Sequence, residues 1–122
     1  MLYVGAVYYV IGAVAHFFAL TIFPWFDGAL YAPYQDTVIA FVALVLAYFL
    51  IVAARNPVKN SDLVNAIIVS ATAASIVSIA IIWKVNFAAL GAPGKELQTI
   101  TEGILGLFWV GALLAFRPRH NN

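Results

Sequence analysis

The fold is decided by the stretch "TVIAFVALVLAYFLIVAA", residues 37–54, which has 18 residues and no charged side chain. An α-helix needs roughly 20 mostly apolar residues to cross the hydrocarbon core of a bilayer. Because lipid offers the backbone no hydrogen-bond partner, such a segment is expected to be helical. Three further apolar stretches lie at about residues 2–23, 66–83 and 100–116. We therefore predict an all-α integral membrane protein, a four-helix bundle with up-down topology that forms a single domain over residues 1–122.

The composition also places the chain in lipid. Hydrophobic residues make up 65% of it and charged residues 9%, whereas soluble domains carry roughly 25% charged residues. The formal net charge is +1 and no basic run occurs, so the expected partner is the lipid bilayer, and nucleic acid is not expected. The absence of cysteine excludes disulfides, iron–sulfur clusters and cysteine-ligated zinc.

Basic residues predict the orientation in the membrane. Arg55 and Lys59 lie between the second and third stretches, and Arg117 and Arg119 follow the fourth. Loops with an excess of lysine and arginine stay in the cytoplasm, so both termini are expected there, in the plasma membrane of a bacterium or archaeon. Aromatic residues near the other ends of the stretches are expected to form a belt at the outer interface, namely Trp25, Tyr31, Tyr34 and Trp83.

His16 lies inside the first apolar stretch, where an ionisable side chain is costly. At about 100° per residue, its helical face carries mostly small residues, while bulky residues lie opposite. The first set is Gly5, Tyr9, Gly12 and Ala19, and the second is Val7, Val14 and Phe18. Small residues let membrane helices approach closely, so His16 is expected to point into the bundle. At 1.5 Å per residue it lies about 10 Å below the outer end of its helix.

Each of the other stretches also carries one ionisable residue in its outer part. Asp36 heads a face of Ala40, Ala43, Ala47 and Ala54. Lys84 ends a face of Ala66, Ser70, Ala73, Val77 and Ala80. Glu102 shares its face with Gln98, Thr99, Gly106 and Trp109. Two acids and two bases that converge in this way can largely neutralise one another, as a low-dielectric site requires.

These faces predict a polar pocket that opens outward and holds a ligand or a proton. His16 and Glu102 are expected to contact each other, because they lie at similar depth on neighbouring helices. The full predicted site is His16, Glu102, Asp36, Lys84, Gln98, Trp109 and Tyr9. Structural alternatives stay open: Asp36 and Lys84 suit helix ends, a His16–Glu102 bond would lock two helices together, and the two aromatic residues would pack.

One segment resembles a known family. Residues 40–79 contain an apolar helix that ends in Ala-Ala-Arg-Asn-Pro at 53–57, then a polar turn and Leu63-Val64 at the start of the next helix. This pattern resembles the DoxX-like and BphX-like group of small bacterial membrane proteins. The resemblance implies a four-helix membrane fold and an association with membrane oxidoreductase systems. Where an acidic residue is expected in the third helix, this chain has Ala73-Ala74, and no catalytic residue is carried over.

Three function classes are expected from these observations. The first is a non-catalytic accessory or interaction subunit of a membrane complex, with a membrane-protein partner or a second copy of the chain. The second is a carrier or binding protein for a small lipophilic ligand such as a quinone, or for a proton-coupled solute. An enzyme ranks last, because no nucleophile and no metal-ligand set is recognisable. No metal site and no catalytic residue is assigned, and the cofactor is left open.

Overall fold

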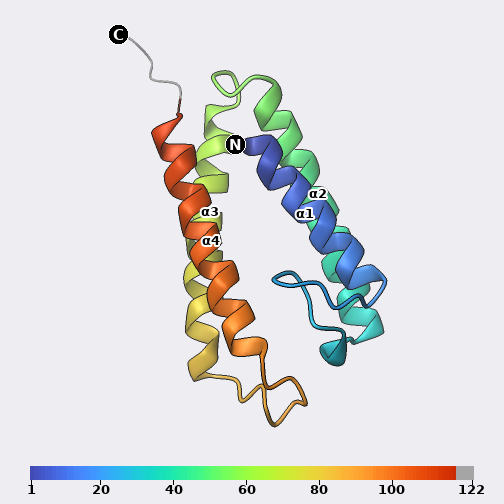
Figure 1. Ribbon diagram of the computed structural model, residues 1–122. Coiled ribbons are helices and arrows are strands. Elements are labelled where there is room, and N and C mark those ends of the chain that lie inside the picture. The colour runs from blue at the N-terminus through green and yellow to red at the C-terminus, as the bar shows by residue number, and fades with distance from the viewer. Residues whose placement is uncertain (118–122) are drawn as a thin grey trace.

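The computed structural model describes residues 1–117, and in this range the chain folds into four α-helices and no strand (Figure 1). The helices are α1 (Leu2–Phe17), α2 (Pro33–Arg55), α3 (Ser61–Ala80) and α4 (Lys95–Ala115). Two short 3-10 helices accompany them, η1 (Gly28–Leu30) before α2 and η2 (Ile81–Trp83) directly after α3. The predicted all-helical architecture is confirmed for the described residues.

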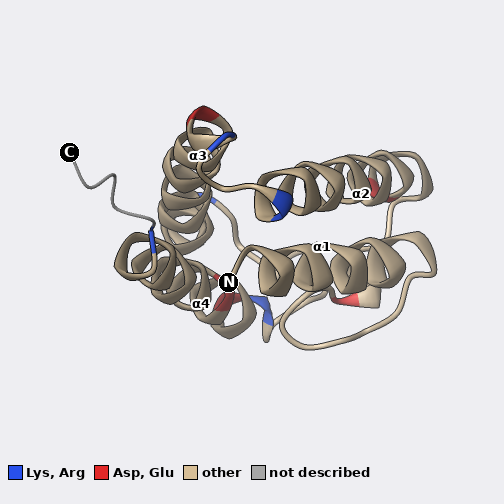
Figure 2. Cartoon of the chain, turned by 90° about the horizontal axis from the view of Figure 1, so that it is seen from above, with Lys and Arg blue, Asp and Glu red and all other residues tan. Residues whose placement is uncertain are grey.

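Three helices are long and apolar enough to cross a membrane: α2, α3 together with η2, and α4. Most acidic and basic positions lie near helix ends or in loops, so long parts of each helix carry no charge (Figure 2). The fourth helix, α1, has 16 residues, which span about 24 Å at 1.5 Å per residue. That is less than the roughly 30 Å of a typical hydrocarbon core.

The prediction that the first helix extends to residue 23 is wrong. The helix ends at Phe17, and Ala19 adopts a left-handed conformation with φ 55°. The amide of Leu20 donates to the carbonyl of Ala15 at 2.9 Å, which is the hydrogen bond of a Schellman helix end. Further on, Pro24 disfavours a helical conformation at Phe23. The apolar residues 18–23 therefore belong to a folded loop.

This loop turns back along α1. Ile22 and Phe26 exchange two backbone hydrogen bonds, of 2.9 and 3.0 Å, in an isolated bridge. Trp25, which follows Pro24, packs on the first helix: its ring centroid lies 5.4 Å from that of Tyr8. Trp25 is thus not part of the predicted belt at the outer interface. Three other residues of that belt, Tyr31, Tyr34 and Trp83, are exposed.

Consecutive helices form two pairs, α1 with α2 and α3 with α4 (Figure 1). The predicted alanine face of α2 is confirmed, since Ala40, Ala43 and Ala47 are buried. Alanines at 6 and 13 of α1 are also buried, and side chains this small let two backbones approach closely. The opposite face of α1 is exposed as predicted, at Val7, Val14 and Phe18.

The predicted packing face of α3 is wrong. Ala66, Ser70, Ala73 and Val77 are exposed, and the helix instead buries Val64 and Ser75. Ser75 lies against two glycines of α4: a Cβ at Gly103 would come within 2.8 Å of the Ser75 carbonyl oxygen, and one at Gly106 would collide with the Ser75 hydroxyl. The two glycines of α4 therefore decide which face of α3 packs.

The two pairs meet near the N-terminal end of α1 and diverge toward the other end, where the loop of residues 18–32 extends between them (Figure 1). The α2–α3 turn, which carries Lys59, lies at the same end as the C-terminus of α4 (Figure 1). Arg55 and Arg117 are therefore at that end too, as the up-down topology requires. Arg119 lies outside the described residues.

Candidate functional sites

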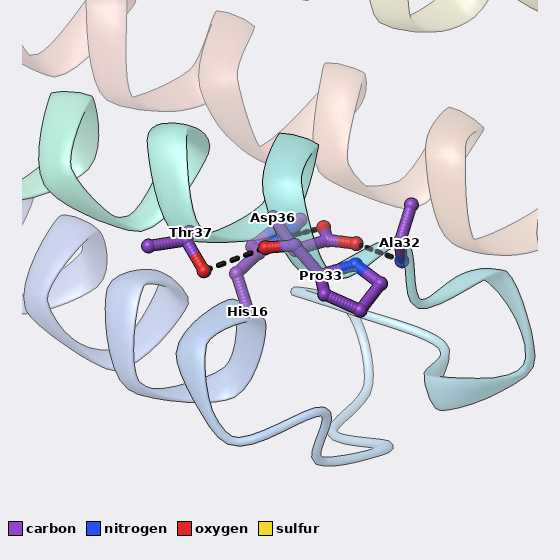
Figure 3. A network of polar contacts seen from close by, with 5 residues as sticks. All are labelled: His16, Ala32, Pro33, Asp36 and Thr37. Atoms are coloured by element: carbon purple, nitrogen blue, oxygen red, sulfur yellow. Dashed lines mark hydrogen bonds and ion pairs between the residues drawn. The ribbon is translucent and has the colours of Figure 1, made fainter.

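His16 forms an ion pair with Asp36 and not with Glu102. It lies in the last turn of α1, and Asp36 lies in the first turn of α2. The Nδ1 atom of His16 donates to Oδ1 of Asp36 at 2.6 Å (Figure 3). Because an ionised carboxylate only accepts, Nδ1 carries the proton. The prediction that His16 lies about 10 Å below the outer end of its helix is wrong. The helix α1 ends at Phe17, one residue after His16.

Asp36 also fastens the start of its own helix. Its second oxygen, Oδ2, accepts a hydrogen bond from the backbone amide of Ala32 at 2.6 Å. One residue further, the Thr37 hydroxyl donates to the carbonyl of Pro33 at 2.6 Å (Figure 3). Asp36 is only 4% exposed, and a negative charge near a helix N-terminus is stabilised by the helix dipole. The carboxylate thus joins the end of α1 to the beginning of α2.

The loop and α4 close over this ion pair. The Phe26 ring stacks on the His16 imidazole with centroids 4.3 Å apart, and Phe26 is 4% exposed. Nζ of Lys95, the first residue of α4, lies 5.9 Å from the centroid of the Phe26 ring, within the range of a cation–π contact. His16, Asp36, Phe26 and Lys95 therefore form one tertiary cluster, which we call the His16 cluster.

Glu102 is paired with Tyr8, two helical turns away from His16 on α1. The Tyr8 hydroxyl donates to Oε1 of Glu102 at 2.7 Å. Seven residues along α4, Nε1 of Trp109 donates to the carbonyl of Met1 at 2.9 Å. Because α1 and α4 run in opposite directions, the same step of seven residues leads from Met1 to Tyr8. Glu102 therefore lies beside Tyr8, two helical turns from His16, and the predicted His16–Glu102 contact is not formed.

A cavity of about 390 Å³ lies beside the Tyr8–Glu102 hydrogen bond, between α1, α3 and α4. Its polar side chains are Tyr8, Tyr9, Ser75, Ser78 and Glu102, and the rest of the lining is apolar or aromatic. Three residues of the predicted site line it, namely Tyr9, Glu102 and Trp109. We call it the Glu102 cavity.

The remaining predicted residues lie elsewhere. His16 and Asp36 belong to the His16 cluster. Gln98 is buried on α4, one turn before Glu102, but does not line the cavity. Lys84 is exposed at the end of η2, in agreement with the alternative that it marks a helix end. The single polar pocket predicted from the helical faces is thus two separate sites.

Sequence reasoning missed Tyr8 and Ser75 as site residues. Tyr8 lies three residues after Gly5 and four before Gly12, so these three share one helical face. A Cβ at Gly5 would come within 3.0 Å of Cε2 of Trp109, and one at Gly12 within 3.2 Å of Cδ1 of Trp25. The glycine spacing therefore marks the face of α1 on which aromatic rings pack, and Tyr8 is its central residue.

Comparison with known proteins finds no match that bears on these sites. No family model matches the chain, and neither a curated protein nor a solved structure matches it. The resemblance of residues 53–57 to the DoxX-like and BphX-like group therefore stays a prediction.

Within residues 1–117, no group of three or more histidine, aspartate or glutamate side chains gathers in a way that could hold a metal ion. The two sites instead offer different chemistry. The His16 cluster combines a buried carboxylate with an imidazole, which is a structural or proton-exchanging arrangement. The Glu102 cavity combines free volume with a carboxylate and aromatic walls, features that small-molecule sites also have.

Proposed function

We propose that this protein is an integral membrane protein that binds a small lipophilic molecule in the Glu102 cavity. The observation that carries the proposal is the cavity itself, about 390 Å³ with a mainly apolar lining and the Tyr8–Glu102 pair as its polar point. Small-molecule sites typically have volumes of roughly 300–1,000 Å³, apolar walls and a few polar groups that orient the ligand. A carrier that moves the same ligand would use the same site.

The flank of the cavity favours a ligand that arrives through lipid. Three residues that line it are also exposed on the outside of their helices: Val4 is 56% exposed, Leu105 47% and Phe108 74%. In a bilayer these apolar side chains would face acyl chains, because lipid is the solvent around a membrane helix. A lipophilic molecule would then enter sideways, between α1 and the α3–α4 pair.

The proposal includes an orientation with both termini in the cytoplasm, in a bacterial or archaeal plasma membrane. It is supported by Arg55, Lys59 and Arg117, which lie at one end of the helices, because lysine and arginine are enriched in cytoplasmic loops. In this orientation Trp109 lies in the cytoplasmic half of α4, and the His16 cluster lies toward the outer side.

The binding proposal is tested by filling the cavity from α3. Ala74 lines the cavity, and its neighbour Ala73 is exposed and does not. Binding of the neutral fluorescent probe N-phenyl-1-naphthylamine is measured with the full chain in nanodiscs, against empty nanodiscs. Ala74→Phe is expected to remove saturable binding, and Ala73→Phe to leave it unchanged. Equal binding by both variants would contradict the proposal.

A second candidate is the accessory subunit of a membrane complex, and the exposed face of α3 favours it. Ala66, Ser70 and Ala73 recur at helical spacing on this face and are exposed. Small residues of this kind allow a partner helix to approach closely. Cysteine cross-linking from position 70 in native membranes, followed by purification under mild detergent, would trap such a partner or a second copy.

A further inference from the structure

The described side chains that line the Glu102 cavity include one acid and no base. Glu102 is the one acidic residue of its lining, and none of the described lining residues is a lysine, arginine or histidine. Outside the lining, Lys95 begins α4 seven residues before Glu102, about 10 Å along the helix. Its Nζ lies over Phe26, and its charge interacts with that of Glu102. Met1 lines the cavity near Trp109, and its α-amino group is seven residues from Tyr8, about 10 Å along α1.

The carboxylate retains hydrogen-bonding capacity for a ligand. The Tyr8 hydroxyl donates to Oε1, with an O···O distance of 2.7 Å, the ordinary length of an O–H···O hydrogen bond. An ionised carboxylate offers about four lone-pair sites on its two oxygens. Tyr8 therefore holds Glu102 in place beside the cavity and leaves most of its acceptor sites open.

The walls supply a second kind of attraction for positive charge. Tyr8, Tyr9, Phe108 and Trp109 all line the cavity, and the faces of aromatic rings attract cations. The rings of Tyr8 and Tyr9 stand edge to face, with centroids 5.9 Å apart. A neutral occupant would use the area of these rings but would have no charge with which to attract the Glu102 carboxylate.

We propose that the occupant of the Glu102 cavity is a lipophilic organic cation, that is, an ammonium group attached to an aromatic or alkyl body. This inference rests on the proposed binding of a lipophile and adds the charge of the ligand. The ammonium group would neutralise Glu102, and the hydrophobic body would lie against the aromatic and alanine walls. A neutral quinone is the contrasting occupant.

Two probes of the same shape separate these possibilities. Benzyltrimethylammonium is a cation, and neopentylbenzene has carbon in place of its nitrogen. Binding of each probe to the full chain is measured by equilibrium dialysis with nanodiscs of zwitterionic lipid, against empty nanodiscs. The native chain is expected to bind the cation about tenfold more tightly, because the ion pair and the cation–π contacts form in a site shielded from water.

A charge-removing variant locates the preference. Glu102→Gln keeps the shape of the side chain and is expected to weaken binding of the cation about tenfold while leaving the neutral probe unaffected. Glu96→Gln is the matched control, since Glu96 lies in the first turn of α4 and does not line the cavity. It is expected to change neither affinity.

Each outcome decides a different point. Equal affinity of the native chain for the two probes overturns the cation inference and leaves lipophile binding standing. Binding of neither probe beyond empty nanodiscs overturns both. A preference for the cation that survives Glu102→Gln, in protein that retains helical circular dichroism, overturns the assignment to Glu102. The comparison of the two probes uses the native chain, so it decides the inference even if Glu102→Gln does not fold.

Discussion

Replacement of Asp36 by alanine is expected to destabilise the protein more than any other single loss of a carboxylate in the described residues. Asp36 is 4% exposed and accepts two hydrogen bonds, from His16 Nδ1 and from the Ala32 amide, each at 2.6 Å. The substitution leaves both donors without their acceptor. An unsatisfied buried donor costs about 1–3 kcal/mol, and the His16 side chain, which is 19% exposed, recovers part of this by contact with solvent.

Asp36→Ala is therefore expected to lower the free energy of unfolding by about 2–4 kcal/mol. Asp36→Asn keeps the size of the side chain and one oxygen acceptor, so its expected loss is about half as large. Unfolding is followed by circular dichroism in mixed micelles with increasing denaturing detergent. The matched control is Asp27→Ala, since Asp27 accepts one backbone hydrogen bond, from Ala29 at 2.9 Å, at an exposed site. The control is expected to cost about 0.5–1.5 kcal/mol.

The reasoning would be refuted if Asp36→Ala cost no more than Asp27→Ala. In that case the ion pair of His16 and Asp36 contributes nothing beyond an exposed hydrogen bond. Equal losses for Asp36→Ala and Asp36→Asn would show that the charge of the carboxylate, rather than its acceptor geometry, supplies the stability.

Three further predictions concern the backbone, the packing and the topology. Ala19→Gly is expected to stabilise the protein by about 0.5–1 kcal/mol, because Ala19 has φ 55° and the relief of left-handed strain exceeds the added chain entropy; thermal unfolding checks this, and a destabilised variant would contradict it. Gly5→Ala is expected to lower the free energy of unfolding by about 1–3 kcal/mol, because the new Cβ would collide with the Trp109 indole on α4. Its control, Gly111→Ala, has open space around it and should be neutral or stabilising in the same unfolding assay. A reporter fused after Asn122 should read cytoplasmic and one inserted in the loop of residues 28–33 should read exterior; the reverse pattern would overturn the proposed orientation.

The helices themselves could be predicted from the sequence because long runs of uncharged residues form a simple pattern. Long runs without charge, such as residues 37–54, have one stable conformation in an apolar solvent, since only a helix satisfies its own backbone. The exposed faces of α1 and the alanine face of α2 also followed from side-chain size. The end of α1 was harder to predict, because the apolar residues 18–23 suit lipid, a loop or a helix equally well.

The contacts of the ionisable residues could not be predicted from the sequence. Polar and apolar residues are spread around α3 and do not form one distinct face. The choice of Ser75 as its packing residue therefore came from the glycines of α4. His16 meets Asp36 because α1 ends at Phe17 and α2 follows alongside, and Glu102 meets Tyr8 because α4 crosses α1 two turns earlier. The number of helices and their apolar character depend on local composition, which the sequence contains directly. The split into a His16 cluster and a Glu102 cavity depends on where helices end and which backbones approach, and these are properties of the folded chain.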